Sequence, residues 1–450
     1  MTVQRFPSRI SGPPPGRGGM WESLRIPQFR WLYLSNTTFF LAMQGQLVVR
    51  SWLVYSLTGS EFALGLVSLM VALSMLSLGP VGGVAADRFE RRGVVAAGQA
   101  TVVVAEVVVL SLLLSGRLDY WHILVQVTVV GAVFPFVMPA RNAIVADVVG
   151  RRRLTNAMAL SMTAVNVTRV VGPAVGGFLI WAAGVNVAYS INAGLYALAL
   201  AGMMGVDRAP VADPSKHSML HNMGQGFRYV AENRLVLVLL FFGLVPMFLV
   251  MPFQTLLVVF AEDIWQVGAG GLGALSGAAG VGGVVGAAFV AWRSYSTRRL
   301  RLMMTSVFAF GLFMMGFALS PWFWLGLPLV LAGSAFQAIY TTLNNTAIHV
   351  LIPDSVRGRV SGFLTMSFSL PMLGVAPISA LAEVWGAPVA VGLASLLAVV
   401  VAIVFYLASS DLRRMDLLIR RAFRAAARAD AERTVRSETP APAVTRGSAP

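Results

Sequence analysis

The sequence predicts an all-α membrane protein with twelve transmembrane helices in two six-helix bundles. Hydrophobic residues make up 57% of the 450 residues and charged residues only 12%, and the mean hydropathy is +0.75. A soluble domain cannot hide so much apolar surface from water, so lipid must be the solvent. The chain also divides into long apolar runs, and about 20 helical residues are enough to cross a hydrocarbon core of about 30 Å.

Six apolar runs precede a polar central stretch and six follow it. The first six lie near 33–56, 62–85, 94–115, 120–142, 155–181 and 185–206, and the others lie near 235–260, 269–292, 302–320, 322–345, 359–383 and 387–408. This order predicts an N-terminal bundle over 31–206, a central loop over 207–234 and a C-terminal bundle over 235–408. Residues 1–30 are expected to be a disordered N-terminus and an interfacial segment, and 409–450 a basic amphipathic helix and a disordered tail.

The charges are distributed unevenly between the two sides of the predicted bundles. The net charge of +15 comes from 34 Lys and Arg against 19 Asp and Glu. Nearly all the basic residues fall in loops and tails on one side, and Arg117 alone falls on the other. Because basic loops stay in the cytoplasm, this pattern predicts that both termini are cytoplasmic. Its natural partner is membrane lipid, and the pattern argues against nucleic acid.

No catalytic, metal or cofactor site is predicted, so the chain is not expected to be an enzyme. Cysteine is absent and the four histidines are scattered, and no nucleophile has a base beside it. The single lysine, Lys216, is not preceded by glycine, so no Walker A loop for ATP can be drawn.

A charged turn is predicted between the second and third apolar runs. It reads Gly82-Gly83-Val84-Ala85-Ala86-Asp87-Arg88-Phe89-Glu90-Arg91-Arg92, and its arginines favour the cytoplasmic side. The stretch resembles the loop that joins the second and third helices of major facilitator superfamily transporters, although Glu90 stands where that family usually has glycine. The simpler alternative is a basic loop that only fixes the orientation of the chain.

The resemblance implies a gate on the cytoplasmic side. A carboxylate at the end of one helix is stabilised by free N–H groups at the start of another. Asp87 would therefore meet the start of the eleventh helix, and one of three neighbouring arginines would pair with Asp147. The expected gate residues are Gly83, Asp87, Arg88, Arg91, Arg92, Asp147, Arg357 and Arg359.

The fifth apolar run carries a second motif, Asn166-Val-Thr-Arg169-Val-Val-Gly172-Pro173-Ala-Val-Gly176-Gly177. Gly172 and Gly176 predict close approach of another helix, and Pro173 removes one backbone hydrogen bond. The motif resembles the fifth helix of drug and proton antiporters of the superfamily. A packing feature with no role in coupling is the alternative.

Three charged residues stand deep inside the predicted spans: Arg50, Glu106 and Arg169. A bare charge at the centre of a span costs at least about 2.5–3.5 kcal/mol, so each should face a partner or a cavity. Glu106 could carry a proton, pair with Arg169 or extend toward the interface, and the structural pairing is favoured. Arg50 is then the candidate contact for an anionic group on a substrate.

In this superfamily the first, fourth, seventh and tenth helices line the central cavity. The resemblance therefore implies lining residues on three of the predicted helices: Asn36, Gln44, Gln46, Arg50, Phe248, Met251, Gln337, Tyr340 and Asn344. The alternative for the amides is hydrogen bonding between helices.

Residues 139–177 and 46–60 resemble one branch of the superfamily, that of enterobactin exporters and macrolide-efflux proteins. The resemblance implies a monomeric exporter in the bacterial inner membrane, which moves a drug, siderophore or other secondary metabolite by alternating access driven by protons. Two alternatives stay open. One is an importer of an anionic nutrient, which Arg50 and Arg169 suggest, and the other is a sensor or scaffold that moves no solute.

Overall fold

The computed structural model describes residues 21–208, 228, 231–293, 299–352, 370–413 and 417. All regular elements in these residues are helices, as predicted. The short helix η1 (Glu22–Arg25) is followed by an N-terminal group of long helices, which are α1 (Pro27–Thr58), α2 (Glu61–Arg88), α3 (Arg91–Leu114) and α4 (Tyr120–Met204).

The long helix α4 is bent into three successive segments by two glycines. Gly150 has φ 70° and Gly184 has φ 85°, a backbone conformation that glycine adopts without the strain a side chain would add. The three segments correspond to the fourth, fifth and sixth predicted spans.

The C-terminal group contains more and shorter helices. Its elements are α6 (Arg234–Val250), α7 (Phe253–Val259), η2 (Phe260–Ile264), α8 (Gly268–Trp292), α9 (Arg299–Ala318), α10 (Phe323–Leu351), α12 (Leu370–Leu373), α13 (Val375–Trp385), α14 (Ala387–Ala408) and α15 (Ser410–Arg413). Pro252 stands between α6 and α7, where it interrupts the seventh predicted span.

Nine helices in the described part of the chain are long and apolar enough to cross a membrane. This finding supports a multi-pass protein but does not establish the predicted count of twelve. One of the nine, Arg152–Met204, has 53 residues and contains the bend at Gly184.

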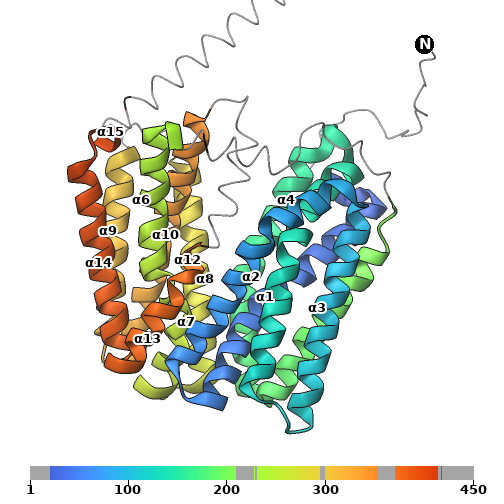
Figure 1. Ribbon diagram of the computed structural model, residues 1–450, viewed down its shortest axis with the longest axis horizontal. Coiled ribbons are helices and arrows are strands. Elements are labelled where there is room, and N and C mark those ends of the chain that lie inside the picture. Colours follow the sequence, from blue (N-terminus) through green and yellow to red (C-terminus); the bar gives the residue numbers. More distant parts are fainter. Residues whose placement is uncertain are drawn as a thin grey trace, which may run out of the picture.

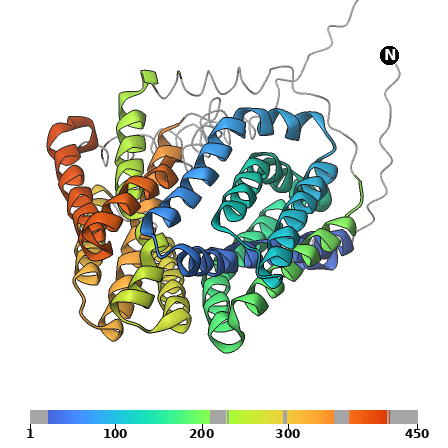
Figure 2. The same cartoon turned by 60° about the horizontal axis from the view of Figure 1, so that its bottom comes forward.

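The two groups of helices lie side by side and approach each other at one end (Figures 1 and 2). At that end one hydrophobic core contains residues of both groups, such as Val54 and Leu64 with Phe260 and Leu272. We call it the joined end. At the opposite end the two groups have separate hydrophobic cores. One surrounds Ile144 in the N-terminal group, and the other lies wholly within the C-terminal group. Because Arg91, Arg152 and Arg293 lie there, we call it the arginine-rich end.

The predicted turn over 82–92 is mostly helix. α2 stays helical to Arg88, and only Phe89 and Glu90 separate it from α3. The helix lies directly against α4 in this region, because a Cβ at Gly82 would be 2.6 Å from the carbonyl carbon of Pro135. The prediction of a turn from Gly82 was therefore wrong, because α2 packs on α4 at Gly82 and stays helical to Arg88.

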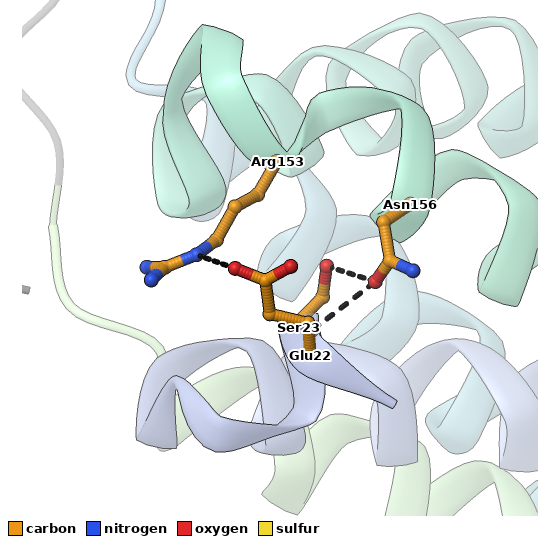
Figure 3. A network of polar contacts seen from close by, with 4 residues as sticks. All are labelled: Glu22, Ser23, Arg153 and Asn156. Atoms are coloured by element: carbon orange, nitrogen blue, oxygen red, sulfur yellow. Dashed lines mark hydrogen bonds and ion pairs between the residues drawn. The ribbon is translucent and has the colours of Figure 1, made fainter. Parts of the chain in front are cut away.

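The segment before α1 is docked on α4 (Figure 3). The hydroxyl of Ser23 donates to Oδ1 of Asn156 at 2.6 Å, and the backbone N–H of Ser23 donates to the same atom. Nε of Arg153 lies 3.1 Å from Oε1 of Glu22. These contacts fix the start of α1 against the second segment of α4.

Candidate functional site

Glu106 of α3 has no exposed surface and lies among four polar side chains, one of which is Tyr189. Oε2 accepts a hydrogen bond from Gln46 at 3.1 Å, and Oε1 accepts one from Gln126 at 2.7 Å. Nη2 of Arg50 lies 3.7 Å from Oε1. Gln46 and Arg50 stand one turn apart on α1, and Gln126 belongs to the first segment of α4. A buried carboxylate needs a countercharge and further hydrogen bonds, and this arrangement supplies both.

This geometry corrects two predictions about the intramembrane charges. Glu106 pairs with Arg50 and not with Arg169, because α1 and α3 both pack on α4 and the side chain of Arg50 reaches Glu106 there. The charge of Arg50 is thus already matched, and its side chain is only 13% exposed. The prediction that Arg50 meets an anionic substrate loses its basis, since that role requires an arginine without a carboxylate partner.

Arg141 is a second buried charge, and the sequence analysis gave it no role. It is 2% exposed, and Nη1 donates to Oδ1 of Asn36 at 2.9 Å. Its guanidinium carbon lies 4.1 Å from the ring centre of Phe39 and 5.6 Å from that of Phe40. Nε and Nη2 have no acceptor among the described residues. The sequence did contain a signal for this position, because the residues after 142 are apolar. They continue the first segment of α4 to Gly150, so Arg141 lies inside this helical segment and not at its end.

Four predicted cavity-lining residues are buried instead. Asn36 and Gln46 belong to the two clusters just described. Tyr340 is 1% exposed and its hydroxyl donates to the backbone carbonyl of Phe242. Asn344 is 4% exposed and packs against Gly243, where a Cβ would lie 2.3 Å from Nδ2 of Asn344. These polar groups join α10 to α6, as the alternative of helix–helix contacts expects. The predicted residues that keep partial exposure are Gln44, Arg50, Phe248, Met251 and Gln337.

Arg169 differs from the other two arginines because it is exposed and unpaired. It lies on the second segment of α4, and no described residue forms a hydrogen bond or ion pair with it. Its backbone carbonyl faces α8 of the other group, where a Cβ at Gly280 would be only 2.9 Å from that oxygen. The backbone of Arg169 therefore stands at the contact between the two groups of helices. Asn166, one turn earlier, is also exposed.

The predicted glycine stripe of the fifth span makes two close helix contacts. A Cβ at Gly172 would lie 2.6 Å from Cβ of Gln44, and one at Gly176 would lie 3.0 Å from the carbonyl oxygen of Gly45. Gly172 and Gly176 thus let α1 approach closely, and Pro173 lies within the same helical segment. The adjacent Gly177 faces the other group, because a Cβ there would lie 2.3 Å from Cα of Gly273 on α8.

The predicted gate is only partly within the described residues. The pairing of Asp147 is confirmed and the partner is Arg91, whose Nη1 lies 2.8 Å from Oδ2. Arg92 donates to the backbone carbonyl of Met204 at 2.8 Å. Gly83, Asp87 and Arg88 belong to the last turns of α2. Arg357 and Arg359 lie outside the described residues, so the expected contact between Asp87 and the eleventh span stays a prediction.

A family model described as transmembrane secretion effector matches residues 18–430. The enterobactin exporter EntS of Escherichia coli O1:K1 / APEC is 25% identical over 351 residues, which cover 75% of this chain and 81% of the exporter. The protein of the same name from Shigella boydii serotype 18 gives the same values.

Two solved structures have the same overall fold. The nucleoside transporter NupG has a TM-score of 0.70 and 14% identity, covering 84% of this chain and 98% of its own. A bacterial homologue of the human lysosomal transporter Spinster, solved in an inward-facing and unoccupied conformation, has a TM-score of 0.66 and 15% identity, covering 88% and 97%. At these identities the likeness concerns the fold alone.

Proposed function

The chain belongs to the transmembrane secretion effector family of major facilitator transporters, and from this premise we propose that it exports a small molecule by proton-driven alternating access. The family and the relatives are transporters rather than enzymes, which supports transport as the activity. The relatives named as enterobactin exporters support export as the direction. The substrate class that we propose is a drug, siderophore or other secondary metabolite.

The arrangement of the hydrophobic cores is the observation that carries this proposal. One core spans both groups at the joined end, while each group keeps a separate core at the arginine-rich end. A transporter of this kind must open to one side while it is closed to the other. We propose twelve spans in the bacterial inner membrane, with the arginine-rich end and both termini in the cytoplasm. The joined end then faces outward, and the arrangement is the inward-facing state.

The three intramembrane arginines suggest the charge of the substrate. Arg50 is neutralised by Glu106, and Arg141 is enclosed by Asn36 and Phe39. Arg169 is the exposed arginine at the contact between the groups. We therefore assign to Arg169 the anionic contact that the sequence analysis gave to Arg50. A guanidinium binds carboxylates or catecholates through two parallel hydrogen bonds, so the proposed substrate carries such a group.

Everted membrane vesicles from cells that express the chain test this function. The vesicles are energised with a proton gradient and given a panel of antibiotics, siderophores and neutral dyes. Uptake into the vesicles that collapses when the gradient is dissipated is the expected result. Vesicles that lose a preloaded compound instead indicate an importer, and no movement of any compound supports the sensor or scaffold alternative. A chain with Asp87→Asn serves as the matched control for transport.

A further inference from the structure

Glu383 joins the two groups of helices at the joined end, which faces outward in the proposed topology. It lies near the end of α13, in the C-terminal group. Its Oε2 accepts two hydrogen bonds from the N-terminal group, and the side chain of Glu61, the first residue of α2, hydrogen-bonds to the same carboxyl group. The hydroxyl of Ser60 donates one at 2.9 Å, and the backbone N–H of Phe62 donates the other at 3.0 Å. Both donors belong to the start of α2. A carboxylate of one group therefore occupies the N-terminus of a helix in the other.

This contact supplies an acceptor for a free N–H group at the start of α2. The first N–H groups of a helix have no partner inside the helix, and a negative charge near them is favoured by the helix dipole. Ser60 accepts a hydrogen bond from the N–H of Ala63 at 3.2 Å, so it caps one of these groups itself. The N–H of Phe62 is satisfied by Glu383. When the groups separate at this end, that N–H and the hydroxyl of Ser60 lose their acceptor.

Two neighbouring contacts hold the same seam. α2 and α13 pack backbone to backbone one turn further in, because a Cβ at Gly65 would lie 3.0 Å from Cα of Ala376 and 2.7 Å from Cβ of Ser379. The phenol of Tyr55, near the end of α1, donates to Oδ2 of Asp263 in η2. Each contact pairs the N-terminal group with the C-terminal group, and each lies at the joined end.

We propose that Glu383, held on the N-terminus of α2, is an outer latch that stabilises the inward-facing state. The latch forms when the outer end is closed and breaks when it opens, so it sets the equilibrium between the two states without touching the substrate. Tyr55 and Asp263 form its second contact. This inference rests on the alternating access proposed above.

Spin labels measure the latch directly. Cysteines at Ser115 and Leu319 place one label on each group at the joined end, where both residues are exposed, and the chain has no cysteine of its own. Glu383→Ala removes the acceptor, and we expect the ratio of long to short distances between the labels to rise about fivefold, since an exposed helix cap is worth about 1 kcal/mol. Glu383→Gln keeps an acceptor oxygen and gives a smaller rise. Tyr55→Phe, which removes the second contact, gives a rise of its own.

The matched control is Glu262→Ala. Glu262 is an exposed carboxylate in η2 at the same end, and it forms no hydrogen bond or ion pair with the described residues of the N-terminal group, so its removal leaves the distances unchanged. An unchanged or shorter distance in Glu383→Ala, or a larger rise in Glu383→Gln than in Glu383→Ala, overturns the proposal. The measurement needs neither substrate nor net export. A wild-type chain that exports nothing but opens on loss of Glu383 would refute the proposed function and leave the latch intact.

Discussion

Nη2 of Arg50 lies 3.7 Å from Oε1 of Glu106, and this is the buried ion pair of the N-terminal group in the described part of the chain. The carboxylate has no exposed surface and the guanidinium little. In the described part of the C-terminal group the buried polar residues are uncharged. The two groups of helices therefore differ in chemistry, because the buried charged residues in the described part of the chain belong to the N-terminal group.

Replacing Glu106 by Gln should destabilise the fold because it leaves Arg50 buried without a countercharge. Breaking a buried pair from one side costs about 3–5 kcal/mol. The double variant Arg50→Gln with Glu106→Gln should recover much of that loss, since two amides can share hydrogen bonds with Gln46 and Gln126. Thermal unfolding of the purified protein, followed through its 10 tryptophans, measures both effects. Equal stability of Glu106→Gln and the wild type would show that the pair is not a structural unit.

The helical membrane fold and the family could be predicted from the sequence because short local patterns of residues indicate both. Apolar runs fix which segments span the membrane, and glycines four residues apart indicate where helices approach, as Gly172 and Gly176 do against α1. The pairing of Asp147 was also predictable from its position beside a cluster of arginines.

Partner choice inside the bundle could not be predicted, because it depends on how each helix is rotated. Glu106 has two arginines at similar depth, and only the packing of α1 and α3 on α4 selects Arg50. Arg141 was missed for another reason. The predicted span ends at residue 142, whereas the helix continues to Gly150 and encloses Arg141. Glu383 and Phe62 are more than 300 residues apart in the chain, and no local pattern links a carboxylate to the start of a distant helix.

The contact between Gly177 and Gly273 should not tolerate a side chain. A Cβ at Gly177 would lie 2.3 Å from Cα of Gly273, so Gly177→Ala must push α4 and α8 apart. We expect export to fall at least tenfold while the protein still inserts. Gly283→Ala on α8 is the control, because a Cβ there meets nothing within 4 Å and alanine favours a helix over glycine by about 1 kcal/mol. Equal export by the two variants would contradict the inferred contact between the groups.

Replacing Arg169 by Gln should weaken export of anionic compounds more than that of neutral ones. The expected loss for an anionic substrate is about tenfold, because a charged hydrogen bond is worth about 1.5–3 kcal/mol. Arg169→Lys should keep part of the activity, since it retains the charge without the planar fork. Transport rates of matched anionic and neutral compounds in everted vesicles give the comparison. If a permanently cationic dye is the best substrate, Arg169 does not select an anion.

Introduced cysteines should report the orientation of the two ends. A cysteine at Ser115, exposed at the joined end, should react with an impermeant thiol reagent added to intact cells. A cysteine at Arg293, exposed at the arginine-rich end, should react only after the membrane is permeabilised, because basic ends stay in the cytoplasm. Labelling of position 293 in intact cells would reverse the proposed topology and, with it, the inward-facing assignment.

The two ends of α2 should act on the transport equilibrium in opposite directions. Asp87 lies in the last turn of α2 at the arginine-rich end, where the family resemblance assigns it to closure of the cytoplasmic side. Glu383 holds the first turn of the same helix at the joined end. Asp87→Asn should therefore shift the Ser115–Leu319 label distances toward the closed outer end, while Glu383→Ala shifts them toward the open one.

The double variant Asp87→Asn with Glu383→Ala should return close to the wild-type distribution, because effects at distant, independent sites add in free energy. Export should still be low in the double variant, because the cytoplasmic end then lacks the contact of Asp87 and the outer end lacks that of Glu383. A double variant that keeps the full shift of Glu383→Ala would mean that Asp87 does not stabilise the outward-facing state. The charged end of α2 would then serve only to orient the chain in the membrane.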